Sequence, residues 1–271
     1  MSDVHPFDTA ICLTQIEPGV WQGMPSAAYA NMVGSFGGVT TATVLNAVMS
    51  DDRRTGDPVS MTINLCSAMG PGAFVITSKL QRTGKYIQHW SLEVSQDGAV
   101  CATASVICGA RSDVFSHQPV DRPVVPRAED CAVFPNANFL KWLEHYEFRF
   151  ADGAPSWTGE GHAEPKSPKS AVWVGDNPPR KLDYLSLAAL ADSFFLRLLH
   201  VRGTMEPMGS VSITTHFLAT PDELTDQGNQ PVLGTADSTR MHANFHDQQV
   251  QLWSTDGKIL ATGTQLVWYR Q

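Results

Sequence analysis

The spacing of hydrophobic residues changes from helical to strand-like along the first half of this chain of 271 residues. Apolar side chains recur at helical spacing over residues 34–49, where Ser35 is a candidate N-cap, and apolar and polar residues then alternate over residues 59–109. A helix followed by an antiparallel meander is therefore predicted, after a short strand and an irregular loop over residues 10–34. Turn signals at Gly70-Pro71-Gly72, Thr83-Gly84-Lys85 and Asp97-Gly98 divide the meander into four strands, at residues 59–69, 73–82, 86–96 and 99–109.

The second half of the chain has the same plan. A helix is predicted over residues 182–199, because apolar residues cover nearly all of its circumference. Residues 112–139 hold several prolines, show little periodicity and are predicted to connect the two halves. Further strands are predicted at residues 142–151 and 171–174 before the helix, and at 209–219, 232–240, 242–254 and 258–270 after it.

An internal repeat supports this division. Val59-Ser60-Met61-Thr62 matches Val211-Ser212-Ile213-Thr214 (211 − 59 = 152), and Asp97-Gly98 matches Asp256-Gly257 (256 − 97 = 159). The change of offset places about seven extra residues in the second copy (159 − 152 = 7), which we assign to a loop over residues 220–231. The chain is thus predicted to be a tandem repeat of one α+β unit.

In each copy the sheet must curl around the apolar helix to bury it. This is the hotdog arrangement, so the predicted fold is an α+β double hotdog. We expect an N-terminal hotdog over residues 1–115, a linker over 116–137 and a C-terminal hotdog over 138–271. We also expect the two sheets to join edge to edge into one extended sheet, because pairing removes an exposed edge from each.

Asp192 is a single carboxylate in the middle of the apolar residues 182–199. An unpaired buried carboxylate is costly, so it needs partners, and a base held in a dry cleft would explain its position. Two other interpretations fit the spacing equally well. Asp192 could cap a second short helix beginning at Ser193, or its side chain could point into solvent.

Gly37 and Gly38 stand at the predicted start of the first helix. Free N–H groups at a helix start can approach an oxygen that carries developing negative charge. Close packing of the helix start against a strand would equally require small residues there.

Composition excludes several classes of function. The net charge of −8 and the lack of a basic run argue against nucleic-acid binding, and an anionic ligand would need local positive groups. No apolar run is long enough to span a membrane and the first residues lack a signal-peptide pattern, so we expect a cytoplasmic protein without a membrane partner. Five cysteines without paired spacing are expected to be reduced core thiols, and neither a metal site nor a cofactor is predicted.

Several stretches together resemble the double-hotdog acyl-CoA thioesterases of the acyl-CoA thioesterase II type. They are Phe36-Gly37-Gly38, Leu190-Ala191-Asp192 and the closing strand at residues 261–267. Ser210 also stands seven residues before Phe217, where this family has a Ser or Thr. The resemblance spans nearly the whole chain.

The resemblance implies hydrolysis of an acyl-CoA thioester by a water molecule, without a covalent intermediate. Asp192, Ser210 and Gln265 would hold that water, and the backbone N–H of Gly37 or Gly38 would polarise the thioester oxygen. In the first copy the repeat places Pro58 opposite Ser210 and Val106 opposite Gln265. One active site per chain is therefore expected.

The residues themselves leave two of these assignments open. Gln265 shares a strand face with small and apolar residues, so its amide should be buried, and it could instead bond only to sheet backbone. Strict alternation places Ser210 on a polar face with Ser212, Thr214 and His216. Either this face lines the substrate passage, or Ser210 is only the first residue of the strand.

Two other functions compete with hydrolysis. A hotdog dehydratase or hydratase would need a histidine base beside the carboxylate, for which His216 and His89 are conceivable. The second alternative is a non-catalytic acyl-CoA binding protein.

We predict a homo-oligomer, because relatives with a single hotdog assemble and closed homo-oligomers are common. Light scattering at micromolar concentration should give at least twice the mass of one chain, and a monomer mass would contradict the prediction.

Overall fold

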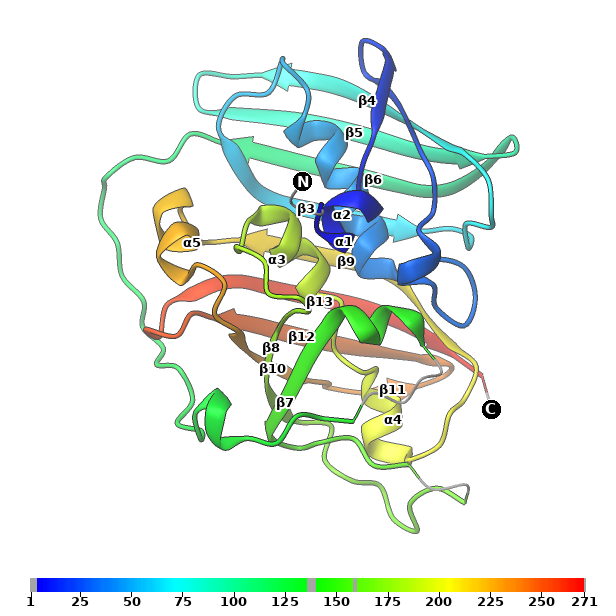
Figure 1. The fold of residues 1–271 in the computed structure, drawn as a ribbon, viewed down its shortest axis with the longest axis vertical. Coiled ribbons are helices and arrows are strands. Elements are labelled where there is room, and N and C mark those ends of the chain that lie inside the picture. Colours follow the sequence, from blue (N-terminus) through cyan, green and yellow to red (C-terminus); the bar gives the residue numbers. More distant parts are fainter. Residues whose placement is uncertain (1–3, 136–139, 158–159, 271) are drawn as a thin grey trace.

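The computed structural model describes residues 4–135, 140–157 and 160–270. In the first half, helix α2 (Gly37–Met49) lies against an antiparallel sheet (Figure 1). The strands of this half are β1 (Thr14–Glu17), β2 (Val20–Gly23), β3 (Asp57–Leu65), β4 (Phe74–Thr83), β5 (Ile87–Gln96) and β6 (Ala99–Gly109). The short helices α1 (Pro6–Ala10) and η1 (Ala27–Tyr29) precede α2.

The second half repeats this plan around helix α3 (Tyr184–Leu190), with α4 (Arg197–Arg202) and α5 (Pro221–Gln227) added. The 3₁₀ helices η2 (Ala128–Asp130) and η3 (Lys141–His145) come before it. The strands are β7 (Tyr146–Asp152), β8 (Ser170–Asp176), β9 (Met208–Phe217), β10 (Val232–Asp237), β11 (Met241–His242), β12 (Phe245–Trp253) and β13 (Ile259–Tyr269).

Over the described residues the strands form one 13-stranded sheet, in the order β1-β2-β4-β5-β6-β3-β9-β13-β12-β10-β8-β7, with β11 paired to β12. The halves meet where β3 pairs antiparallel with β9, for example Ile63 with Ile213. The predicted double hotdog with its sheets joined edge to edge is confirmed. The two central helices, α2 and α3, pack against each other inside the curved sheet, and one continuous apolar core includes both.

Several predicted elements differ in detail. The helix expected over residues 182–199 is wrong as one piece, because the chain turns after α3 and resumes helical structure only at Arg197. The strand expected from residue 142 begins at Tyr146, after η3. Residues 10–34 hold a two-stranded hairpin rather than one strand. The loop expected over 220–231 contains α5, which a capping box between Thr220 and Glu223 begins.

The connection between the halves contains η2 and otherwise irregular structure in its described part. The predicted boundary between residues 137 and 138 lies outside the described residues. Of the five free cysteines three are buried, so the prediction of core thiols is wrong for the exposed Cys12 and Cys66. No helix in the described ranges has the length and apolar character needed to cross a membrane.

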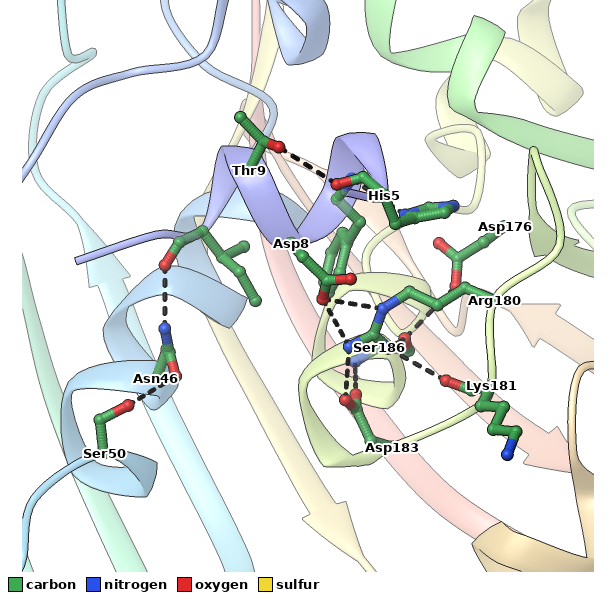
Figure 2. A network of polar contacts seen from close by, with 12 residues as sticks. His5, Asp8, Thr9, Asn46, Ser50, Asp176, Arg180, Lys181, Asp183 and Ser186 are labelled. Atoms are coloured by element: carbon green, nitrogen blue, oxygen red, sulfur yellow. Dashed lines mark hydrogen bonds and ion pairs between the residues drawn. The ribbon is translucent and has the colours of Figure 1, made fainter. Parts of the chain in front are cut away.

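Arg180 connects the N-terminal helix to the start of α3, as Figure 2 shows. Its Nη2 donates to Asp8 Oδ1 on α1 at 2.8 Å and to Asp183 Oδ2 at 2.7 Å. Its Nη1 donates to Ser186 Oγ at 2.7 Å, while Asp183 caps α3 by accepting from Ser186 N at 2.8 Å. The guanidinium thereby fixes where α3 begins, and so where the chain beyond α3 enters the interior.

Replacing Arg180 by Met should lower the free energy of unfolding by about 1–3 kcal/mol, because two carboxylates and a hydroxyl lose a charged donor. Urea denaturation measures the effect. Lys141→Met is the control, since the Lys141–Glu144 ion pair is exposed and should contribute less than about 1 kcal/mol. Equal losses in both variants would contradict the prediction.

Candidate active site

Asp192 lies two residues beyond the end of α3, where the chain turns before α4. Its backbone N–H donates to Ala189 O at 3.1 Å, and only 7% of the residue is exposed. The next helix begins at Arg197 with Leu196 as its N-cap. Both alternative interpretations of Asp192, a cap of a helix starting at Ser193 and a solvent-facing side chain, are therefore wrong.

The structure brings Gln265 and Ser210 to this carboxylate. Gln265 Nε2, from β13, donates to Asp192 Oδ1 at 2.7 Å, although 73 residues separate the two in sequence. The same amide nitrogen also donates to Ser210 Oγ of β9. Gln265 is buried, and the bonds of its amide run to these side chains and to Gln248, not to sheet backbone.

A β-bulge turns Ser210 toward Gln265. Leu266 pairs with Ser212 and Val267 with Ser210, so Val211 is an extra residue on β9. Beyond the bulge the side chains of β9 change face relative to strict alternation. Ser210 consequently shares the inner face with Gln265 and Val267, and the prediction that it lies with Ser212 on a polar face is wrong.

The first copy has the same bulge without the polar groups. Ile107 pairs with Ser60 and Cys108 with Pro58, which leaves Val59 unpaired. Val106 is paired with Met61 as Gln265 is with Ile213. Pro58 and Val106 therefore occupy the positions equivalent to Ser210 and Gln265, as the repeat predicts, and neither can hold a water by a side-chain hydrogen bond.

Gly37 and Gly38 make the approach of Asp192 to the start of α2 possible. A Cβ on Gly37 would lie 2.5 Å from Asp192 Oδ2, and one on Gly38 would lie 2.6 Å from Ala189 O. The backbone N–H of Gly38 donates a hydrogen bond to the Asp192 carboxylate. Gly38 therefore serves close packing and holds the base, while Gly37 borders the cavity described below.

Burial raises the pKa of Asp192 from its ordinary value to about 7. Hydrogen bonds from Gln265 and from the Gly38 N–H oppose this shift, because they favour the ionised form. A carboxyl with a pKa near neutrality can both accept and release a proton at physiological pH, which suits a general base.

A cavity of about 630 Å³ opens beside Asp192, between the start of α2, the turn after α3 and β9. Asp192, Ser210 and Gly37 lie on its wall, and Asp192 and Glu206 supply its carboxylates. No lysine, arginine or histidine is among the described residues that line it. The wall is mainly apolar, with the large side chains Met32, Phe36, Met69, Leu140, Trp142, Phe194, Phe195, Leu199, Met205, Met208 and Trp268.

Hydrogen bonds link Gln248 to Gln265 and Arg197 to Gln248, and neither residue is predicted from the sequence. Gln248 is fully buried on β12 opposite Gln265, and Arg197 at the start of α4 is 1% exposed. Gln248 lies on the same face of β12 as the buried Val250 and Leu252, so the strand pattern predicts that it is buried. In the described part of the chain, no cluster of histidine, cysteine, aspartate and glutamate is arranged to hold a metal ion.

Comparisons with known proteins give the family of the chain. The family model for the acyl-CoA thioesterase C-terminal domain matches residues 126–269, and that for the N-terminal domain matches residues 26–109. A search among curated proteins found no match.

Solved structures show the same architecture. A hot dog fold protein of unknown function from Alicyclobacillus acidocaldarius has a TM-score of 0.92 and 35% identity, over 99% of both chains. Acyl-CoA thioesterase II TesB2 from Mycobacterium marinum has a TM-score of 0.76 and 16% identity, over 97% of this chain and 98% of that one. The tesB protein of Mycobacterium avium subspecies paratuberculosis has a TM-score of 0.77 and 13% identity, over 98% of each chain.

The extended sheet around two central helices defines a double-hotdog protein. Because the family models match more than half of the chain, it belongs to the acyl-CoA thioesterase family.

The raised pKa of Asp192 predicts a pH-dependent stability difference. A folded pKa above the unfolded value contributes stability at low pH that is lost as the pH rises through the folded value, here about 7. Between pH 5 and pH 8 the wild type should therefore lose about 2 kcal/mol of unfolding free energy relative to Asp192→Asn. Urea denaturation of both proteins at the two pH values tests this, and a constant difference would contradict it.

Proposed function

We propose that the protein hydrolyses acyl-CoA thioesters, with Asp192 as the general base that activates a water molecule. The observation that carries the proposal is a buried carboxylate on the wall of an apolar cavity, with one oxygen bonded to an amide at 2.7 Å. Membership of the acyl-CoA thioesterase family supports thioester hydrolysis.

In the proposed reaction, water attacks the thioester carbonyl carbon while its proton passes to the Asp192 carboxylate. The C–S bond of the tetrahedral intermediate then breaks, and Asp192 returns the proton to the leaving thiolate. Ser210 Oγ would hold the water beside the carboxylate and orient its lone pair, while the Gln265 amide, which donates to both Asp192 and Ser210, would keep these two groups in place. No covalent link between the acyl group and the protein is required.

The thioester oxygen would become negatively charged and needs a donor. Gly37 is the first residue of α2, so its N–H lacks an intrahelical acceptor, and the residue borders the cavity. We assign the oxyanion contact to Gly37 rather than Gly38, because the Gly38 N–H donates to Asp192.

The acyl group would occupy the apolar cavity, whose volume of about 630 Å³ is typical of a site for a drug-sized ligand. Because the described lining residues include no cation, the phosphates of CoA would lie outside the cavity. The proposal has one site per chain, since Pro58 and Val106 replace the polar pair in the first copy. Oligomerisation and a cytoplasmic location stay predictions.

The geometry does not favour a dehydratase or hydratase. His89 and His216 are exposed on their strands, on the face opposite that of their buried neighbours Trp90 and Phe217. Neither can serve as a base beside Asp192.

Asp192→Asn should lower kcat for acyl-CoA hydrolysis by roughly 10²–10⁴-fold, because the base is lost. A thiol-release assay over acyl-CoAs of different chain length measures this, and calorimetry should show that the variant still binds the substrate. Absence of hydrolysis by the wild type with every substrate, or full activity of the variant, would refute the proposed function.

Ser210→Ala and Ser212→Ala form a matched pair on β9, since the bulge places the two hydroxyls on opposite faces. Loss of one hydrogen bond of about 1–2 kcal/mol corresponds to roughly 10-fold in kcat. Ser210→Ala should show this loss and Ser212→Ala should keep wild-type kcat. The reverse result would remove Ser210 from the site.

A further inference from the structure

Arg197 is a buried arginine whose hydrogen-bond acceptors are neutral oxygens. Its Nη1 donates to Pro168 O at 3.0 Å and to Ser170 Oγ at 2.8 Å, and its Nη2 donates to Phe195 O. Its Nε donates to Phe195 O at 3.0 Å and to Gln248 Oε1 at 3.2 Å. The contact with Gln248 directs one of its donors toward the active site.

Gln248 connects this guanidinium to Gln265. The two glutamines face each other on neighbouring strands, and Gln248 Nε2 donates to Gln265 Oε1 at 2.7 Å. Gln265 Nε2 in turn donates to Asp192 Oδ1 at 2.7 Å. A continuous buried chain of hydrogen bonds therefore runs from Arg197 through two amides to the carboxylate.

The chemistry of arginine fixes the direction of this chain. A guanidinium has donors and no acceptor, so the oxygen of Gln248 must face it and the NH₂ of Gln248 must face away. Gln265 then has to offer its oxygen to Gln248, which leaves its own NH₂ for Asp192 and Ser210. If the Gln248 amide were turned over, its NH₂ would face the donors of Arg197. If the Gln265 amide were turned over, its oxygen would face the Asp192 carboxylate.

We propose that Arg197 and Gln248 are positioning residues, which hold the Gln265 amide with its NH₂ toward Asp192 and Ser210. None of Arg197, Gln248 and Gln265 lines the cavity, and the hydrogen bonds connect the first two to the cavity-lining Asp192 through Gln265. The inference rests on the proposed function for its effect on turnover, while its effect on the Asp192 carboxyl is independent of that function.

A purely structural role for Arg197 is the competing explanation. The bonds to Phe195, Pro168 and Ser170 also pin the segment before α4. That role would be impaired by loss of Ser170 but would not involve Gln248. Variants at positions 248 and 170 therefore separate the two explanations.

Gln248→Met removes the amide that orients Gln265 and keeps the cation of Arg197. We expect kcat to fall roughly 100-fold with KM unchanged, because Asp192 and Ser210 lose the amide that keeps them in place while the cavity wall is intact. Gln248→Glu is a second variant of the same shape. Its carboxylate can accept from Arg197, which favours folding, but it cannot donate to Gln265, so kcat should fall in the same way.

Ser170→Ala is the matched control, since it removes an Arg197 partner but keeps the chain through Gln248. Its kcat should stay within about twofold of wild type, even where its melting temperature falls as far as that of Gln248→Met. Arg197→Lys keeps a donor-only cation and should retain more activity than Gln248→Met.

NMR of protein with ¹³C-labelled aspartate, assigned with Asp192→Asn, tests the orientation without any substrate. In Gln248→Met the Asp192 carboxyl should titrate at higher pH than in the wild type, because the Gln265 donor that favours its ionised form is lost. Tyr146 of β7, whose pKa Asp192 raises, and Glu206 and Cys101 on the cavity wall are the other titratable groups near it among the described residues, and the variants leave all three unchanged.

An Asp192 titration in Gln248→Met that is the same as in Ser170→Ala would overturn the proposal, as would equal kcat in these two variants. A wild type without thioesterase activity would refute the proposed function alone, and the titration would still decide the role of Gln248.

Discussion

A carboxylate enclosed by apolar side chains has to be held by donors, and the position of Asp192 imposes this constraint on three separate elements. The chain must leave its helix at Leu190 so that Asp192 can turn inward. The first two residues of α2 must be glycines, because side chains there would collide with the carboxylate and with Ala189 O. The closing strand must supply an amide of the correct orientation. The opposing effects of burial and hydrogen bonding then leave the carboxyl able to titrate near neutral pH.

Most of the fold could be predicted from alternation and the internal repeat, since strands with one buried face carry their register in the sequence. The turn after Leu190 was left open, because only Asp192 and Ser193 interrupt the apolar residues between α3 and α4 and no glycine or proline marks the break. Helix α5 was predictable from the Thr220 and Glu223 capping box, which the interpretation as a loop overlooked.

Only part of the candidate site could be predicted from the alternation of polar and apolar residues. Gln265 is a polar residue among small and apolar neighbours on its strand face, so its burial follows from the pattern, whereas the spacing around Asp192 fits a buried and a solvent-facing side chain equally well. Ser210 was placed on the wrong face, because a bulge adds one residue and alternation cannot detect it. Gln248 and Arg197 contribute through contacts between β12, β13 and α4, and such pairing is not visible until the strands are assembled.

The bulge at Val211 has a counterpart at Val59, in a copy that lacks the polar side chains. The kink of the backbone is thus independent of the chemistry performed beside it, and proline is tolerated at this position of the first copy because a bulge relieves the demand for a ladder N–H. In a dimer of two identical hotdog units, the bulged strand and its side chains would occur twice, and any substitution would change both copies together. Fusion into one polypeptide removes that symmetry, so one copy can keep its hydroxyl and amide while the other carries Pro58 and Val106 at the equivalent positions.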